Sequence, residues 1–244
     1  MKLQVATLVA GTETPAGDGI NGALRCVLIL PDGARCAAVL KRAPLGQVAA
    51  EAFSALGLRA WGLSVPNPYL VDEGGTLAFA SVDLGYPNFK HHLGVNALPK
   101  GVLQDAAIQI AIDFVCQLKS VGLAAACDEA IDNRDRNLGN ILWDGANESW
   151  IDHAAALGQH GIMLDCNKLC RMSIGTIHEH TVKGAALTHH LVLDRGAPVD
   201  AEQGLQATAL VDGGLANFVA ARLSTLGHRL LRRFPAPRDL FSDQ

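Results

Sequence analysis

Three polar side chains between residues 131 and 153 have the types and the spacing that phosphoryl transfer from ATP requires. Asp135 and Asn140 are five residues apart, and Asp152 follows a short apolar run that reads as the end of a strand. The reaction needs one carboxylate to orient and deprotonate the attacking hydroxyl, and an Asn and a second Asp to hold magnesium ions on the phosphates. We therefore predict Asp135 as the catalytic base and Asn140 and Asp152 as metal ligands.

A second aspartate competes with Asp135 for the role of base, because Asp132 lies in the same run D-N-R-D-R-N. The gap to Asn140 favours Asp135, and Asp132 could instead support the loop by accepting hydrogen bonds from its backbone N–H groups. Arg134 and Arg136 are open to two interpretations: solvated charges, or partners of a phosphate or a neighbouring carboxylate. The arginines also exclude a calcium loop, since they stand where such a loop needs oxygen ligands.

A glycine-rich stretch near the start of the chain matches G-x-G-x-x-G at Gly17, Gly19 and Gly22. A dinucleotide-binding loop of this pattern would lead into a helix, whereas here a second strand is predicted, so that interpretation fails. Between two strands, such glycines let backbone N–H groups approach phosphates. The loop alone favours this interpretation and an ordinary mobile hairpin equally.

Two charged residues follow at positions that could complete a phosphate site. Lys41 ends a predicted strand in the sequence A-V-L-K, and Glu51 lies in the first turn of a helix predicted over residues 47 to 61. Such a lysine can contact phosphates when a helix glutamate positions it by an ion pair. The structural alternatives are a solvated lysine at a strand end and a carboxylate that favours the helix dipole.

The order of the predicted elements indicates an α+β, bilobal, protein-kinase-like fold. Residues 1–82 hold five short strands and one helix, which predicts a small antiparallel sheet lobe. Residues 83–99 contain Gly, Pro and Asn and are predicted as a hinge or connector. Residues 100–244 are predicted as a mostly helical lobe with the catalytic loop and the metal-binding aspartate. The elements predicted in this lobe are a helix over 101–122, a hairpin over 141–151 and helices over 173–193, 200–211 and 214–234.

Composition narrows the classes of function that need to be considered. With 244 residues and 49% hydrophobic content the chain can bury a sizeable core, and its net charge of −4 argues against binding to nucleic acid or an anionic membrane. The six cysteines show no zinc-ligand spacing and are expected to be free thiols, and the pairs His91-His92 and His189-His190 and the motif His178-Glu179-His180 are expected not to be metal sites. No apolar run reaches the roughly 18 residues of a membrane span, so we expect a cytoplasmic protein.

Several stretches together resemble the HipA-like kinases of bacteria, in particular the short HipA-like group, which share a distant motif with the phosphatidylinositol kinases. The stretches are N-R-D-R-N-L-G-N-I-L-W-D, W-I-D-H, A-V-L-K, and A-E-A-F-S-A-L-G-L followed by V-P-N-P. The resemblance covers roughly residues 35 to 155. It implies a protein-kinase-like fold that binds ATP and Mg²⁺ and transfers the γ-phosphate, typically to a Ser or Thr of a protein.

The resemblance also implies roles for single residues. Asp135 would be the base, Asn140 and Asp152 would hold metal, Lys41 paired with Glu51 would contact the phosphates, and Gly17, Gly19 and Gly22 would cover them. The chain departs from its relatives at two positions: Asn137 stands where the lipid kinases have the His of D-R-H, and His153 stands where many protein kinases have Phe. No A-P-E segment is present, so regulation by activation-loop phosphorylation is not expected.

Three functions remain in competition at this point. A protein Ser/Thr kinase has the most weight, and a small-molecule phosphotransferase of the aminoglycoside or choline type, which shares the D-x-x-x-x-N-I-L motif, has less. A catalytically silent pseudokinase that serves as a binding module has the least. An acidic groove near Asp152 would favour a cationic small acceptor, and a shallow open groove would favour a peptide. The sequence does not predict the acceptor, a partner protein or the oligomeric state.

Overall fold

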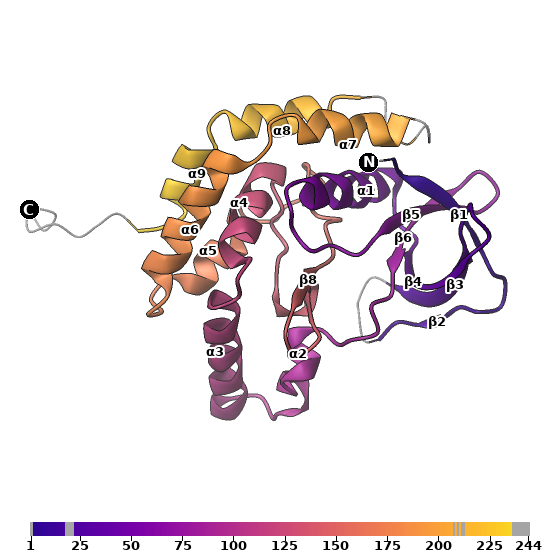
Figure 1. The fold of residues 1–244 in the computed structure, drawn as a ribbon. Helices are drawn as coiled ribbons and strands as arrows, with labels where there is room; N and C mark the ends of the chain where they lie inside the picture. Colours follow the sequence, from indigo (N-terminus) through magenta and orange to yellow (C-terminus); the bar gives the residue numbers. More distant parts are fainter. Residues whose placement is uncertain (1, 18–21, 207, 209, 211–212, 236–244) are drawn as a thin grey trace, which may run out of the picture.

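The computed structural model describes residues 2–17, 22–206, 208, 210 and 213–235, which form an α+β fold (Figure 1). The strands are β1 (Gln4–Leu8), β2 (Thr14–Pro15), β3 (Leu24–Ile29), β4 (Arg35–Lys41), β5 (Pro68–Asp72), β6 (Leu77–Val82), β7 (Ile141–Trp143) and β8 (Glu148–Trp150). The helices are α1 (Leu45–Ala60), α2 (Phe89–His92), α3 (Val102–Cys116), α4 (Val121–Ile131), α5 (Lys168–Ser173), α6 (Glu179–Val192), α7 (Ala197–Gln206), α8 (Leu215–Leu223) and α9 (Leu226–Arg232), with 3₁₀ turns η1 (Val95–Ala97) and η2 (Leu138–Asn140).

The first sheet has the strand order β1-β5-β6-β4-β3-β2, and a further pairing joins the end strand β1 to β3, the neighbour of β2. The expectation of a purely antiparallel sheet is wrong, because β1 runs parallel to β5, with Val5 opposite Leu70. Two parallel strands must be joined by a long crossover connection. The chain between β1 and β5 is such a connection, and it includes three strands and α1. The two-residue strand β2 was not predicted, since Thr14-Pro15 lies among turn-forming residues.

The glycine-rich stretch lies at the tip of an antiparallel hairpin, between β2 and β3. The Ala16 N–H donates to the Ala23 carbonyl over 2.9 Å, which closes the hairpin just before the loop. Gly17 and Gly22 have φ values of 138° and 60°, in the region where a Cβ is disfavoured. Gly19 lies outside the described residues.

Helix α1 is the central element of the core. Its sequence is rich in Ala and Leu, and residues 48–58 are all buried, because α1 packs on β5 and β6 on one side and on α7 on the other. Leu3 next to β1 belongs to the same hydrophobic cluster as Leu205 of α7 and Leu230 of α9. The sheet segment and the C-terminal helices therefore share one core, while a second, smaller cluster is formed by alternate residues of the strands.

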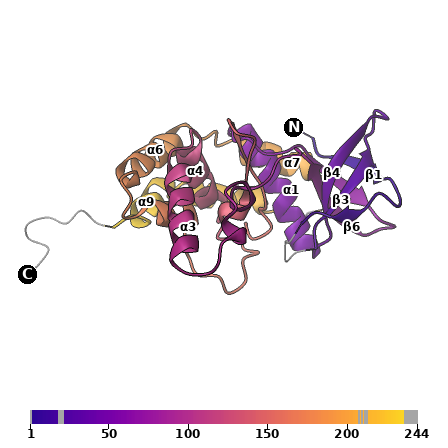
Figure 2. The same cartoon turned by 90° about the horizontal axis from the view of Figure 1, so that it is seen from below.

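The helices predicted over 101–122 and 214–234 are each interrupted. Helix α3 ends at Cys116, and α4 begins at Val121 and turns away by 93°. Helix α4 was missed because its sequence V-G-L-A-A-A-C-D-E-A-I is buried on nearly every side and has no helical period of polar residues. Figure 2 shows α3, α4, α6 and α9 at one end of the molecule and the sheet at the other.

Two smaller expectations are tested by the described part of the chain. No single described helix is long and apolar enough to cross a membrane; only the pair α3 and α4 passes such a test together, and the sharp bend separates them. The six cysteines are free thiols, as expected, and four of them are buried. Burial raises the pKa of the Cys116 thiol to about 11, so this thiol carries little of the reactive thiolate form.

Candidate active site

A cavity of about 780 Å³ lies between the sheet, α1 and residues 135–153. Of the residues predicted to form the site, six line this cavity: Gly17, Lys41, Glu51, Asp135, Asn140 and Asp152. Gly22 is not among the lining residues, although it lies at the base of the same loop. The lining also includes apolar side chains, among them Val39, Ala55, Phe79, Leu142 and Ile151.

Lys41 connects the two halves of the cavity. It ends β4, and its ammonium donates to Glu51 of α1 and to Asp152 Oδ1, the latter over 2.9 Å and across 111 positions of the chain. The second oxygen of Glu51 accepts from the His153 backbone N–H at 2.8 Å, so Glu51 also holds the segment that follows β8. The pairing of Lys41 with Glu51 was expected, whereas the direct contact of Lys41 with Asp152 was not.

The charges in this cluster are buried and strongly coupled. Burial opposes the charge of Lys41, but the Glu51 and Asp152 carboxylates outweigh it and raise the Lys41 pKa. Burial raises the pKa of Glu51 despite the nearby Lys41. Burial acts in the same direction on Asp152, but Lys41 prevails there and lowers the Asp152 pKa. One ammonium thus faces two carboxylates, an imbalance that suits a neighbouring cation.

Asp135 lies in a loop that its own neighbours hold in shape. The side-chain amides of Asn140 and Asn137 both donate to the Asp135 backbone carbonyl, at 2.8 and 3.0 Å. Asn137 also caps η2 by accepting from the Gly139 N–H at 2.9 Å. The Asp135 carboxylate is 38% exposed and pairs with Lys168 Nζ at 2.6 Å.

Arg136 pairs with a carboxylate behind the cavity. It is fully buried and forms a two-pronged ion pair with Asp128 of α4, with N···O distances of 2.9 and 2.8 Å. Its other nitrogen donates to the backbone carbonyls of Ile151 and Asn140, at 2.6 and 3.3 Å, and its guanidinium lies 5.4 Å from the Trp150 ring. Arg136 therefore joins the segments that carry Asn140 and Asp152, and of its two interpretations the neighbouring carboxylate is observed.

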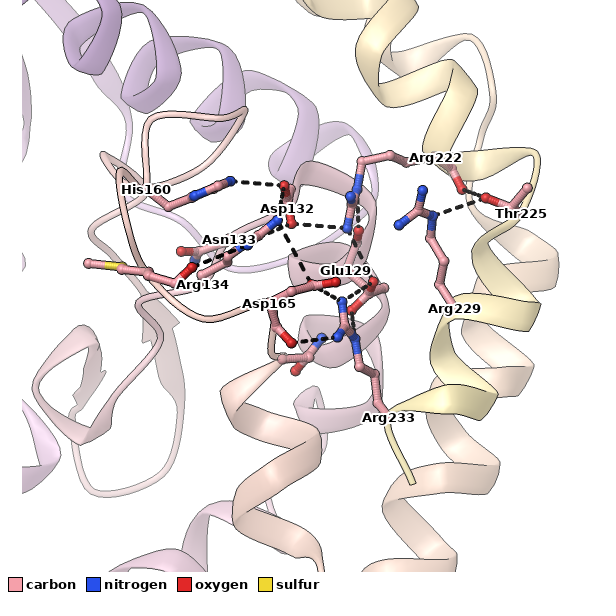
Figure 3. Close-up of polar contacts among 12 residues, drawn as sticks. Glu129, Asp132, Asn133, Arg134, His160, Asp165, Arg222, Thr225, Arg229 and Arg233 are labelled. Carbon is pink, nitrogen blue, oxygen red and sulfur yellow. Dashed lines mark hydrogen bonds and ion pairs between the residues drawn. The ribbon is translucent and has the colours of Figure 1, made fainter. Parts of the chain in front are cut away.

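Asp132 takes part in a different cluster, shown in Figure 3. It is 6% exposed, has a φ of 57° at the end of α4, and accepts from Arg134 at 3.0 and 3.1 Å. Arg222 of α8 and His160 Nε2 each approach it to 3.2 Å. Asp132 does not line the cavity. Its contacts attach the end of α4, where the loop to Asp135 begins, to the C-terminal helices.

The donor set can be compared with what Mg²⁺ requires. Among the described residues no group of three or more His, Cys, Asp or Glu side chains is arranged to hold a metal. Mg²⁺ at a nucleotide site needs only one or two protein oxygens, since phosphates and waters supply the rest. Asp152 binds Lys41 through Oδ1 and Asn140 donates through its amide nitrogen, which leaves the other oxygen of Asp152 and the amide oxygen of Asn140 for such a site.

Two partners of residues at this site, Lys168 and Asp128, had no signal in the sequence that tied them to it. The sequence could have shown that Asn167 caps a helix and that Lys168 lies in its first turn. No sequence spacing, however, relates Lys168 to Asp135. Asp128 precedes the catalytic motif and lies in the unpredicted helix α4, so its partnership with Arg136 was hidden as well.

The fold is similar to that of a solved kinase. Among solved structures, the chain is similar to the Helicobacter pylori proinflammatory kinase CtkA, with a TM-score of 0.57 and 13% sequence identity. The match covers 95% of this chain and 98% of that one. At this identity the likeness shows the fold alone. No protein-family model matches the chain, and none of the curated proteins does.

Proposed function

We propose that this chain is an ATP- and Mg²⁺-dependent phosphotransferase whose acceptor is a Ser or Thr hydroxyl of a protein. The observation that carries the proposal is the convergence of Lys41, Glu51, Asp135, Asn140 and Asp152, from separate parts of the chain, on one cavity. The kinase-like fold supports it. Residues 1–82 and 100–244 then act as the two lobes and residues 83–99 as their hinge.

Each residue has a definite task in this reaction. Lys41, held by Glu51, neutralises phosphate charge, while Asp135 orients the acceptor hydroxyl and receives its proton. A bond forms between the acceptor oxygen and the γ-phosphorus, and the bond to the β–γ bridging oxygen breaks with its electron pair leaving on ADP. Asn140 and Asp152 would hold Mg²⁺, which supplies charge neutralisation on the phosphates when it is bound.

The charges around the cavity favour a protein acceptor over a cationic small molecule. Four carboxylates line it and pair with three cationic side chains, because Lys41 serves two of them: the pairs are Arg25–Asp83, Lys41–Glu51, Lys41–Asp152 and Lys168–Asp135. Lys90 and His91 also line the cavity. A site selected for aminoglycosides or choline would present carboxylates that are free to bind a cationic substrate.

The test is transfer of label from radiolabelled ATP with Mg²⁺ to the chain itself, to a generic protein acceptor, and to an aminoglycoside and choline in separate reactions. We expect phosphoserine or phosphothreonine on protein and no labelled small molecule. If only the aminoglycoside or choline became labelled, the acceptor would be a small molecule and not a protein. Nucleotide binding without turnover would show a pseudokinase, and the absence of both would overturn the proposed function.

A further inference from the structure

Lys168 lies beside the proposed base but belongs to none of the motifs that predicted the site. Its Nζ is 2.6 Å from Asp135 Oδ1, and the two side chains are 34% and 38% exposed. An ion pair this exposed contributes at most about 1 kcal/mol to stability. The ion pair therefore adds little to the stability of the fold. The Lys168 ammonium is more important for what it can bind next to Asp135.

The backbone just before Lys168 is anchored by Asn167 and Asp165. Asn167 is 3% exposed; its Oδ1 accepts from the Cys170 N–H at 3.1 Å and its Nδ2 donates to the Ala125 carbonyl of α4 at 2.8 Å. Two residues earlier, Arg233 donates to the Asp165 carboxylate at 2.5 Å and to the Asp165 carbonyl at 2.9 Å (Figure 3). These contacts hold the start of α5 against α4 and α9, so the Lys168 backbone has a defined position relative to Asp135.

We infer that Lys168 is a catalytic residue of the proposed transfer, whose ammonium contacts the γ-phosphoryl group at its acceptor side and orients the Asp135 carboxylate. This inference rests on the proposed function. The transferring group spreads negative charge over three equatorial oxygens, and positioned cations stabilise it. Lys41 is already engaged by Glu51 and Asp152, whereas Lys168 lies next to Asp135, the residue proposed to receive the acceptor's proton. Lysine binds phosphate as a point charge and keeps its own protons throughout the step.

The experiment compares Lys168→Met and Lys168→Arg with the wild-type full chain. We expect Lys168→Met to lower kcat about 10²–10³-fold, the usual effect of removing one positioned group at a developing charge. ATP affinity should fall while ADP affinity and the urea midpoint stay unchanged, because only ATP carries the γ-phosphate. Lys168→Arg should restore part of kcat, since it restores the charge. Arg171→Met is the matched control, because Arg171 is an exposed cation on the same helix.

Failure of this inference is distinguishable from failure of the proposed function. An inactive wild-type chain overturns both. If the wild-type chain is active and the kcat of Lys168→Met lies within twofold of the wild-type value, Lys168 and Asp135 form an ordinary surface ion pair. This result overturns the inference alone. Equal losses of ATP affinity, ADP affinity and stability would show a purely structural role, and a higher kcat would show that Lys168 restrains Asp135; each of these results also overturns it.

Discussion

At the scale of single residues, two aspartates three positions apart have opposite surroundings. Asp132 adopts a left-handed backbone conformation at the end of α4 and is surrounded by Arg134, Arg222 and His160. Asp135 follows in the loop and lines the cavity. Asp152 is also left-handed, with a φ of 64°. A non-glycine residue in this conformation costs free energy and persists only where its surroundings hold it, and Lys41 and Arg136 do so around Asp152.

Replacing either of two proposed site carboxylates should abolish most turnover. For Asp135→Asn and Asp152→Asn we expect kcat to fall roughly 10³-fold or more, equivalent to about 4 kcal/mol of barrier, because the base or a metal ligand is lost. Initial rates of label transfer at saturating ATP and Mg²⁺ measure the effect. Asp105→Asn, at an exposed position of α3, is the control and should leave kcat unchanged.

Asp132→Asn separates the two candidate bases. Asparagine tolerates the left-handed conformation, but the change removes one charge from the buried cluster in Figure 3. We expect the free energy of unfolding to fall while kcat stays well above that of Asp135→Asn. The assignment of Asp135 as base fails if the order of the two kcat values is reversed.

Arg136 should matter mainly for stability. Its pair with Asp128 is fully buried, and removal of one partner from such a pair typically costs about 3–5 kcal/mol, because the remaining charge is left uncompensated. Urea denaturation of Arg136→Met should show a loss of this size. Arg25→Met breaks a pair in which the arginine is 54% exposed, so its cost should stay below about 1 kcal/mol; similar losses for both variants would contradict the buried role.

At the scale of elements, α4 leads into the loop that carries Asp135, and the position of α4 depends on close packing against α6. A Cβ added at Gly122 would lie 2.4 Å from the Ala185 Cβ and 3.0 Å from the Ala185 backbone carbon. The two helices therefore approach each other closely because position 122 has no side chain. No larger residue fits there unless one helix shifts.

Two glycine substitutions should therefore change stability in opposite directions. Gly122→Ala forces α4 and α6 apart and should cost about 1–3 kcal/mol. Gly184→Ala, in the middle of α6 with nothing within 4 Å of its added Cβ, should stabilise by roughly 0.5–1 kcal/mol through helix propensity. Chemical denaturation of both variants measures the difference, and stabilisation by Gly122→Ala would contradict the packing of α4 on α6.

At the scale of the whole molecule, the cavity lies where distant parts of the chain meet. Lys41 belongs to the sheet, Glu51 to α1 and Asp152 to the segment after β8, and the core of α1 continues into α7. The Leu3 N–H donates to the Gly204 carbonyl of α7 at 3.3 Å, and the Trp61 indole donates to the Asp194 carbonyl at 2.8 Å. A ligand in the cavity would contact both the sheet and residues 135–153. Its binding should therefore raise the free energy of unfolding of the whole chain.

ATP with Mg²⁺ should therefore raise the melting temperature. At a concentration of 100 times its Kd, a ligand that binds only the folded state stabilises it by about 2.7 kcal/mol, which corresponds to several degrees for a chain of this size. Chelation of Mg²⁺ should remove most of the shift, and Lys41→Met should reduce it. Lys119→Met, at an exposed position after α3, should keep the full shift. An identical shift for Lys41→Met and wild type would contradict the phosphate role of Lys41.

Local patterns in the sequence predicted much of the fold. Period-two strands, the Ala- and Leu-rich run of α1 and the hairpin of β7 and β8 were recognised, because each depends on neighbours within a few residues. Helix α4 was missed because complete burial removes the polar period that marks a helix. The parallel pairing of β1 with β5 was missed because strand direction depends on a long crossover and not on composition.

The amino-acid sequence by itself determined which residue types stand at which spacing: a lysine at a strand end, a glutamate one helix later, and Asp135, Asn140 and Asp152 around two short strands. Only the tertiary structure decided that these side chains lie on one cavity, that Asp132 faces the arginines, and that Lys168 lies beside Asp135. The physical reason is that spacing along a chain governs only near neighbours, whereas contacts across tens of residues arise when buried helices and strands pack together.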